Sequence, residues 1–284
     1  MLLIPTLQLL RLPFSFFLMP VFLFALSQAS TINWTQACIV FLILHILVYP
    51  ASNAYNSYMD QDEGSIGGLK HPPKAPKSLY YLTVVMDAAA IGFSCIISIS
   101  FALGIGLYIL ASRAYSYRGI RLKQYPYLGY ATVVFFQGGF TVYLCSMVFG
   151  VSEHFLMASA ACSFLIAGVY PITQIYQHEA DRNDGVKTIS MVVGYIGTFM
   201  LTIFMFAVAM ILLFVYFEQT HTRSHFFILQ AFMLPVVSYF VYWFRLVWIN
   251  KEAANFEHTM KMNLIASVCM NGCFVVLTFL NQTA

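Results

Sequence analysis

The chain has 284 residues, of which 60% are hydrophobic and 9% are charged, and its mean hydropathy is +0.77. Soluble domains carry about 25% charged residues, so this composition argues against an ordinary soluble protein. The net charge of +3 comes from residues scattered through short segments without a basic face, which argues against a nucleic-acid partner. The composition instead predicts a protein whose main partner is the lipid bilayer.

Apolar stretches long enough to cross a bilayer, about 20 residues each, follow one another along the chain. Breaks at charged residues, prolines and glycines divide them into nine, and little is left for an extramembrane domain. We therefore expect an all-α, multi-pass membrane bundle that forms a single domain over 1–284, with the first apolar stretch kept as a helix rather than cleaved as a signal peptide. The predicted spans are 11–30, 35–57, 79–97, 98–115, 127–149, 153–176, 190–216, 225–248 and 261–280.

The lysines and arginines predict the orientation of these spans. If the N-terminus is cytoplasmic, Arg223 is the only one of the 14 that lies outside. Cytoplasmic loops are enriched in Lys and Arg, so this asymmetry predicts a cytoplasmic N-terminus and a site that faces the cytoplasm, which we expect to be that of the cell membrane. The cytoplasmic set is Arg11, Lys70, Lys74, Lys77, Arg113, Arg118, Arg121, Lys123, Arg182, Lys187, Arg245, Lys251 and Lys261.

An internal repeat links the ends of the second and sixth predicted spans. Residues 49–64 align without a gap to residues 170–185, and we call these the first and second acidic segments. Identical residues are Tyr49/Tyr170, Pro50/Pro171, Tyr55/Tyr176, Asp60/Asp181 and Gly64/Gly185, and five further pairs are conservative. Because the two spans run in the same direction, the repeat predicts two parallel four-helix halves plus a ninth helix.

Each acidic segment places two amides and an acid on one helical face. Asn53, Asn56 and Asp60 have the spacing i, i+3, i+7, and Gln174, Gln177 and Asp181 repeat it. Mg2+ prefers such oxygen ligands and commonly holds a substrate phosphate with one or two protein carboxylates. Two facing segments therefore predict a Mg2+-diphosphate site, with capping of helix ends in the wet interface as the structural alternative.

Two groups of basic residues in neighbouring cytoplasmic loops could bind phosphate oxygens. One follows the first acidic segment, and the other follows the fourth predicted span. The alternative for each single residue is the general enrichment of cations on the cytoplasmic side. The groups are Lys70, His71, Lys74 and Lys77, and Arg113, Arg118, Arg121 and Lys123.

These residues resemble the UbiA superfamily of intramembrane prenyltransferases. Asn53-x-x-Asn56-x-Tyr58-x-Asp60-x-x-x-Gly64 is similar to the first family motif, and Glu179-x-Asp181-Arg182-x-x-Gly185-x-Lys187-Thr188 to the second. Between them, the run from Tyr115 to Lys123 resembles a Tyr-Ser…Arg-Leu-Lys segment that many members place after the fourth helix. The similarity covers most of the chain.

The sequence departs from the family pattern at two places. Ser57 stands where the family often has Asp, and Gln177 stands where the second motif has its first Asp. A Gln carbonyl can coordinate Mg2+ but brings no charge, so metal affinity should fall unless another acid compensates.

The resemblance implies a Mg2+-dependent enzyme that transfers a prenyl group from an allylic polyprenyl diphosphate to an aromatic, quinone-precursor-like or other flat acceptor and releases pyrophosphate. It implies catalytic roles for Asp60 and Asp181. Expected metal ligands are Asn56, Asp60, Asp181, Glu63 and Asp184. Expected substrate-binding residues are Asn53, Asn56, Lys70, Tyr115, Arg118, Arg121, Lys123, Gln177 and Lys187.

Three other functions stay open at this point: a terpene cyclase that ionises the same diphosphate, a membrane transporter, and a non-catalytic binding scaffold. Transporter sites usually lie near the bilayer midplane, whereas the acidic segments lie at span ends. Asp87 and His45, inside predicted spans, are either functional or structural. The sequence reveals neither the acceptor, the prenyl length nor the oligomeric state.

Overall fold

The computed structural model describes residues 3–61, 64–151 and 154–283, and within these ranges it is helical without a named strand. Among the described residues, eight helices are long and apolar enough to cross a membrane, and one bent helix pair near the N-terminus makes nine if it is counted as a span. The expected all-α, multi-pass membrane bundle is confirmed. Its elements are α1 (Leu3–Leu10), η1 (Leu12–Phe17), α2 (Met19–Ser27), α3 (Trp34–Phe41), η2 (Leu42–Val48), α4 (Tyr49–Asp60), α5 (Lys77–Ile97), α6 (Ile99–Ser116), η3 (Leu122–Gln124), α7 (Pro126–Val133), η4 (Val134–Phe140), α8 (Thr141–Phe149), α9 (Phe155–Gln174), η5 (Ile175–Gln177), α10 (His178–Asn183), α11 (Ile189–Gln219), α12 (Arg223–Ile249), η6 (Lys251–Ala253) and α13 (Phe256–Thr283).

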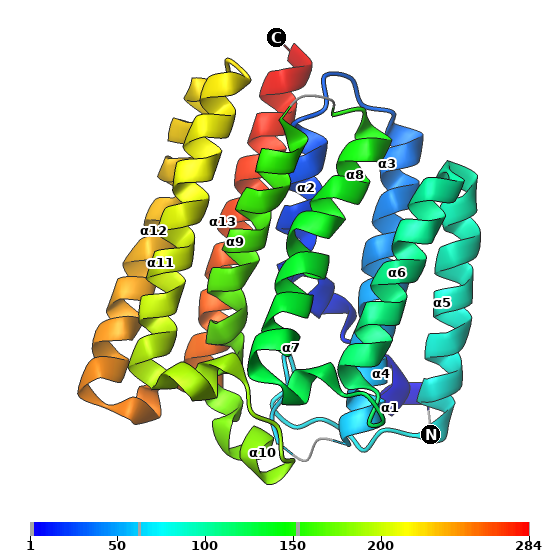
Figure 1. The fold of residues 1–284 in the computed structure, drawn as a ribbon, viewed down its shortest axis with the longest axis vertical. Helices are drawn as coiled ribbons and strands as arrows, with labels where there is room; N and C mark the ends of the chain where they lie inside the picture. Colours follow the sequence, from blue (N-terminus) through cyan, green and yellow to red (C-terminus); the bar gives the residue numbers. More distant parts are fainter. Residues whose placement is uncertain (1–2, 62–63, 152–153, 284) are drawn as a thin grey trace.

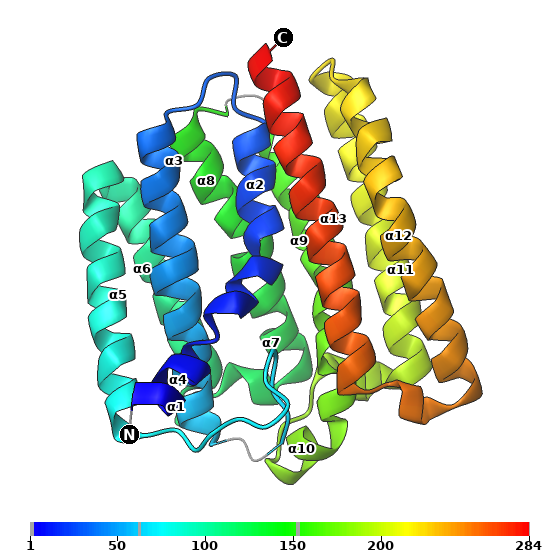
Figure 2. The same cartoon turned by 180° about the vertical axis from the view of Figure 1, so that it is seen from behind.

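The long helices stand side by side, with the N-terminus and α10 at one end of the bundle and the C-terminus at the other (Figure 1). α9 packs against α11, α12 against α13, and α5 against α4 and α6. The last long helix, α13, is the ninth span in chain order. It packs against α2, so the end of the chain lies beside its beginning (Figure 2). Buried apolar side chains from both halves, among them Phe24, Phe101, Phe199 and Trp243, form one core.

The first span differs from the expected helix at 11–30. It begins earlier and consists of two helical pieces, Ile4–Phe17 and Met19–Ser27, bent by 40°. Arg11 adopts a left-handed conformation with φ of 48°, and Pro13 and Pro20 each fall in the first turn of the helix that follows. Proline lacks an N–H group and is tolerated in a first turn, so a new helix starts there instead of the old one continuing. After the break, Ser15 of η1 is buried and Phe14, Phe16 and Phe17 are partly buried.

Two spans contain π-helical turns, η2 in the second and η4 in the fifth. η4 packs closely on α9, because a Cβ at Gly138 would lie 2.7 Å from Cα of Ser163. Only a glycine permits this approach. The contact brings α7, η4 and α8 against the helix that carries the second acidic segment.

Candidate active site

Residues 49–60 of the first acidic segment form the helix α4, so its expected polar face exists. Asn53, Asn56 and Asp60 all line one cavity. The amide of Asn56 donates to Asp60 Oδ2 over 2.8 Å and to Ser116 Oγ on α6 over 3.0 Å. This bonding holds the Asn56 amide nitrogen against the Asp60 carboxylate at the end of the cavity.

The second acidic segment reaches the same cavity by a different route. α9 ends at Gln174, a turn of 3-10 helix follows, and α10 starts at His178. Gln174, Gln177 and Asp181 nevertheless all line the cavity. The Gln177 amide donates to the Ser65 carbonyl over 3.4 Å, which ties this segment to the loop that follows the first one. The two repeated faces therefore meet across one space.

Cations of the 117–125 loop lie against the carboxylates. Lys123 Nζ is 2.5 Å from Asp60 Oδ2, and Arg121 is 3.8 Å from Asp60 Oδ1. The Asp60 side chain is only 3% exposed and that of Lys123 11%, so this pair is shielded from water and interacts more strongly than a surface pair. Arg121 also binds the carboxylate of Asp184. Arg118 lies at the rim, with Nε donating to the Met59 carbonyl over 2.7 Å.

A pair of phenols joins the two halves at the polar end of the cavity. The hydroxyl of Tyr115 on α6 hydrogen-bonds that of Tyr170 on α9, and both residues line the cavity. Tyr170 is the first residue of the second acidic segment. The pair therefore connects the helix before the basic loop to the helix before Asp181.

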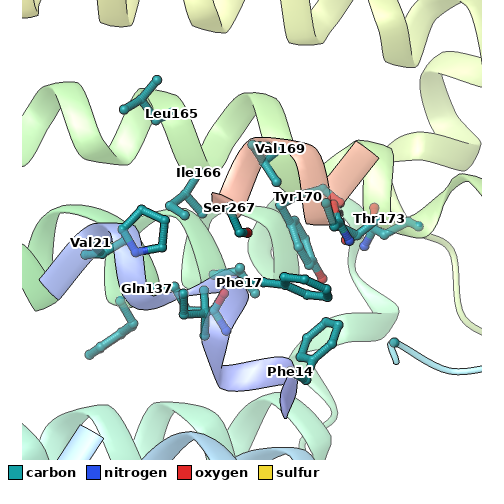
Figure 3. Close-up of a pocket in the computed structure, with 18 of the residues that line it drawn as sticks. Phe14, Phe17, Val21, Gln137, Leu165, Ile166, Val169, Tyr170, Thr173 and Ser267 are labelled. Atoms are coloured by element: carbon teal, nitrogen blue, oxygen red, sulfur yellow. Dashed lines mark hydrogen bonds between the residues drawn. The ribbon is translucent and has the colours of Figure 1, made fainter. Parts of the chain in front are cut away.

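The rest of the cavity is apolar. The whole cavity has a volume of about 350 Å³. Its apolar walls come from η1, α2, α6, η4, α9 and the last three long helices. Figure 3 shows Phe14 and Phe17 of η1 near Tyr170 and Thr173 of α9, with Leu165 and Ile166 farther along the same helix. The charged end of the cavity thus opens into an apolar chamber of the size that holds a small hydrophobic molecule.

The structure brings together most of the residues that the sequence singled out. Asn53, Asn56, Asp60, Tyr115, Lys123, Gln177 and Asp181 line the cavity, and Arg118, Arg121 and Asp184 form an ion-pair cluster behind it. Glu63, like Asp62, lies outside the described residues. Ser116, Gln174, Tyr170 and Arg11 also border the cavity. Arg11 donates to the carbonyls of Asn53 and Gly67, a contact that depends on the break in the first span.

Two expected substrate-binding residues lie elsewhere. Lys70 pairs with Glu257 at 2.5 Å on the exposed surface. Lys187 borders a separate open depression with His178 and Arg182. His178 bonds Ser190 over 2.8 Å and stacks on Tyr195, so its ring supports the start of α11.

The two polar residues that the sequence singled out inside spans, Asp87 and His45, contact neighbouring helices. Asp87 on α5 forms an ion pair with Arg113 on α6, whose guanidinium lies 3.9 Å from the ring centroid of Tyr55. His45 bonds the Ser15 carbonyl and is surrounded by Phe22, Phe41 and Tyr49. Neither residue is among those that line the cavity.

Carboxylates, amides and cations at the mouth of a buried apolar chamber suit an amphiphile with an anionic head. Among the described residues, no three His, Cys, Asp or Glu side chains are grouped to hold a metal ion by themselves. Asp60 and Asp181 are the only two carboxylates of the described residues that line the cavity. Such a sparse set fits a Mg2+ ion that takes its other ligands from substrate phosphates and water.

Solved structures define the class of this fold. The chain is similar to a UbiA homolog from Archaeoglobus fulgidus bound to DMAPP and Mg2+, with a TM-score of 0.75, 16% identity and coverage of 98% of this chain and 99% of that one. The same homolog bound to GPP and Mg2+ matches with a TM-score of 0.74 and 16% identity, over 99% of this chain and 100% of that one. A digeranylgeranylglyceryl phosphate synthase matches with a TM-score of 0.65 and 14% identity, over 99% of this chain and 99% of that one.

The sequence itself places the chain in a family. It belongs to the UbiA prenyltransferase family, whose sequence model matches residues 16–265. No curated protein matches the sequence. The expected resemblance is therefore confirmed over most of the chain, and the protein is a multi-pass integral membrane member of this family.

Proposed function

We propose that this protein transfers a prenyl group from an allylic polyprenyl diphosphate to an aromatic, quinone-precursor-like acceptor and releases pyrophosphate. One observation carries the proposal: Asp60, Asp181 and Lys123 meet at the polar end of a single apolar cavity. The C–O bond to the diphosphate breaks, a bond to an acceptor carbon forms, and the acceptor releases a proton.

Asp60 and Asp181 would hold Mg2+, assisted by the carbonyl oxygens of Asn56 and Gln177. The chemistry of this donor set fits, because all four offer oxygen and the carboxylates supply the charge. Asp60 Oδ1 is buried without a hydrogen-bond partner among the described residues. Solved relatives with the same fold bind Mg2+ together with DMAPP or GPP, which supports the same pairing here. When bound, Mg2+ would neutralise charge that develops on the leaving diphosphate.

Lys123 and Arg121 would bind the diphosphate oxygens, with Arg118 at the rim. Lys123 pairs with Asp60 and Arg121 with Asp184, so each cation is already oriented by a carboxylate. Cations that are fixed in place stabilise a leaving anion without reorganising, which lowers the barrier to its departure. Asn53 and Tyr115 would contact the same head group from α4 and α6.

The chamber behind this head-group site would hold the prenyl chain. Loss of diphosphate from an allylic carbon leaves a carbocation, which water would quench. The described walls of the chamber are largely apolar, and the phenol rings of Tyr115 and Tyr170 at its polar end would lie beside the developing charge. Aromatic faces stabilise cations, so these rings would protect the intermediate until it meets the acceptor.

We infer that the head-group site faces the cytoplasm and that the N-terminus is cytoplasmic. The loops beside α10 and the N-terminus lie at one end of the bundle (Figure 1), and these loops carry most of the lysines and arginines. Cytoplasmic loops of membrane proteins are enriched in these residues. The cell membrane is the location that we propose.

The proposal is tested by measuring pyrophosphate release from farnesyl and geranylgeranyl diphosphate by the detergent-purified protein. Release should require Mg2+ and an aromatic acceptor, and should disappear in Asp60→Ala and Asp181→Ala. Lys70→Ala is a matched control, because it removes a charge from the same end of the molecule but outside the cavity. Acceptor-independent release would identify a terpene cyclase instead. Donor binding without release would identify a scaffold.

A further inference from the structure

The ninth span, α13, lies outside the sequence repeat and presents one face to the cavity. Residues on this face recur every three or four positions, the spacing of one side of a helix. They are Met260, Asn263, Ala266, Ser267, Met270 and Phe274. Two polar side chains, one turn apart, therefore interrupt a wall that is otherwise apolar.

Asn263 and Ser267 are buried, at 5% and 4% exposure, yet neither makes a hydrogen bond from its side chain to any part of the chain that the structure describes. Other buried polar residues of the same helix do. Asn271 donates to the Phe16 carbonyl over 3.3 Å, and Thr278 donates to the Phe274 carbonyl over 2.7 Å. Buried polar groups are nearly always hydrogen-bonded, so the two cavity-facing groups are available to bond a molecule held in the cavity.

The chemistry of this pair differs from that of the head-group site. An amide and a hydroxyl carry no charge, whereas Asp60, Asp181 and Lys123 do. Neutral donors and acceptors suit a neutral hydroxyl or carbonyl oxygen, while an anionic diphosphate is served better by the cations. The cavity thus has two sets of polar side chains of different chemistry, one charged and one neutral.

Aromatic rings border the same space. Phe14 and Phe17 of η1 form an edge-to-face pair with centroids 5.1 Å apart, and Figure 3 shows both rings close to Tyr170, with Ser267 facing the same cavity. Flat rings pack well on such surfaces. The rings and the polar pair line one cavity, so both are open to the same bound molecule.

We propose that Asn263 and Ser267 form the acceptor subsite, where they hydrogen-bond a neutral hydroxyl or carbonyl oxygen of a flat acceptor packed against Phe14 and Phe17. This inference rests on the proposed prenyl transfer and adds the class of acceptor to it. The polar pair orients the acceptor, and the rings hold its plane.

The test compares two probes, naphthohydroquinone and its dimethyl ether, under reducing conditions. Their dissociation constants are measured by equilibrium dialysis against detergent-purified protein with Mg2+ and farnesyl thiolodiphosphate, an unreactive donor. The native protein should bind the hydroquinone about 10-fold or more tightly than the ether, because a site built to bond a hydroxyl rejects the analogue that cannot donate.

Asn263→Leu and Ser267→Ala should each reduce this preference to about 1 to 3-fold, without changing the affinity for the ether or the donor. Thr278→Val is the matched control, since its hydroxyl bonds only its own helix, and it should keep the full preference. Ser267→Ala removes one oxygen and no carbon, so it gives an answer even if Asn263→Leu does not fold.

Equal binding of the two probes by the native protein would overturn the inference, and so would an unchanged preference in both variants. A loss of donor affinity in the variants would also overturn it, because the pair would then serve the diphosphate. Failure of the proposed function is seen separately, as absence of Mg2+-dependent pyrophosphate release from farnesyl diphosphate by the native protein in the presence of the hydroquinone.

Discussion

The two acidic segments share a sequence pattern but not an environment. In the first, α4 is continuous, and Asp60 is held by Asn56, Lys123 and Arg121. In the second, a 3-10 turn separates α9 from α10, and glutamines stand at the two amide positions. Tyr49 of the first segment is buried in the core, whereas its counterpart Tyr170 lines the cavity and bonds Tyr115.

The difference teaches that one repeat can supply two unlike halves of a site. The first segment receives cations from the 117–125 loop, so its carboxylate also orients the groups that we propose bind the diphosphate. The second brings one carboxylate into the cavity, because Asp184 is engaged by Arg121 outside it. We therefore expect the halves to respond differently to substitution.

The largest effect is expected from removing either cavity carboxylate. Asp60→Asn and Asp181→Asn should each lower pyrophosphate release by about 100-fold or more, since each removes charge that, in our proposal, holds Mg2+ at the leaving group. Asp184→Asn should lower it by less than either, because this carboxylate acts on Arg121 and not on the cavity. Steady-state rates at saturating donor check the order. An Asp184 effect as large as that of Asp181 would place a second metal ligand there.

The second largest effect is expected from Lys123→Met. It removes the cation paired with Asp60 and should raise the KM for the donor by about 10-fold or more, as loss of a charged hydrogen bond does. A double-mutant cycle with Asp60→Asn, read from thermal unfolding, should give a coupling of about 1 to 3 kcal/mol, because the pair is largely shielded from water. Additive effects would mean that the contact contributes little to stability.

Gln177→Asp should sharpen the comparison by making the second half resemble the family pattern. An added carboxylate near Asp181 should lower the Mg2+ concentration that gives half-maximal activity by about 3 to 10-fold, since it supplies both a ligand and a charge. A Mg2+ titration of pyrophosphate release measures the shift. Gln137→Asp, in the apolar part of the cavity, serves as the control and should not produce it.

Lys70→Ala should have the smallest effect. Its partner Glu257 is exposed, and exposed ion pairs contribute about 0 to 1 kcal/mol. Activity within about twofold of the native value and a thermal midpoint within a few degrees are expected. A large rise in the KM for the donor would instead show that Lys70 moves to the diphosphate.

Much of the site could be predicted because it is local in sequence. The i, i+3, i+7 pattern placed Asn53, Asn56 and Asp60 on one face, and α4 keeps it. The same pattern contained no information about the 3-10 turn at Ile175–Gln177. The basic group after the first acidic segment led us to place Lys70 among the substrate-binding residues, because position in a loop does not reveal that Glu257, far along the chain, lies beside it.

By itself, the sequence determined the membrane bundle, the repeat and the family, because apolar spans and helical spacing are properties of neighbouring residues. Tertiary structure alone decided which side chains share the cavity. The broken first span brings Arg11, Phe14 and Phe17 to α4 and α9, and α13 adds Asn263 and Ser267. These contacts join residues up to about 250 positions apart, and they depend on how the helices pack rather than on any local pattern.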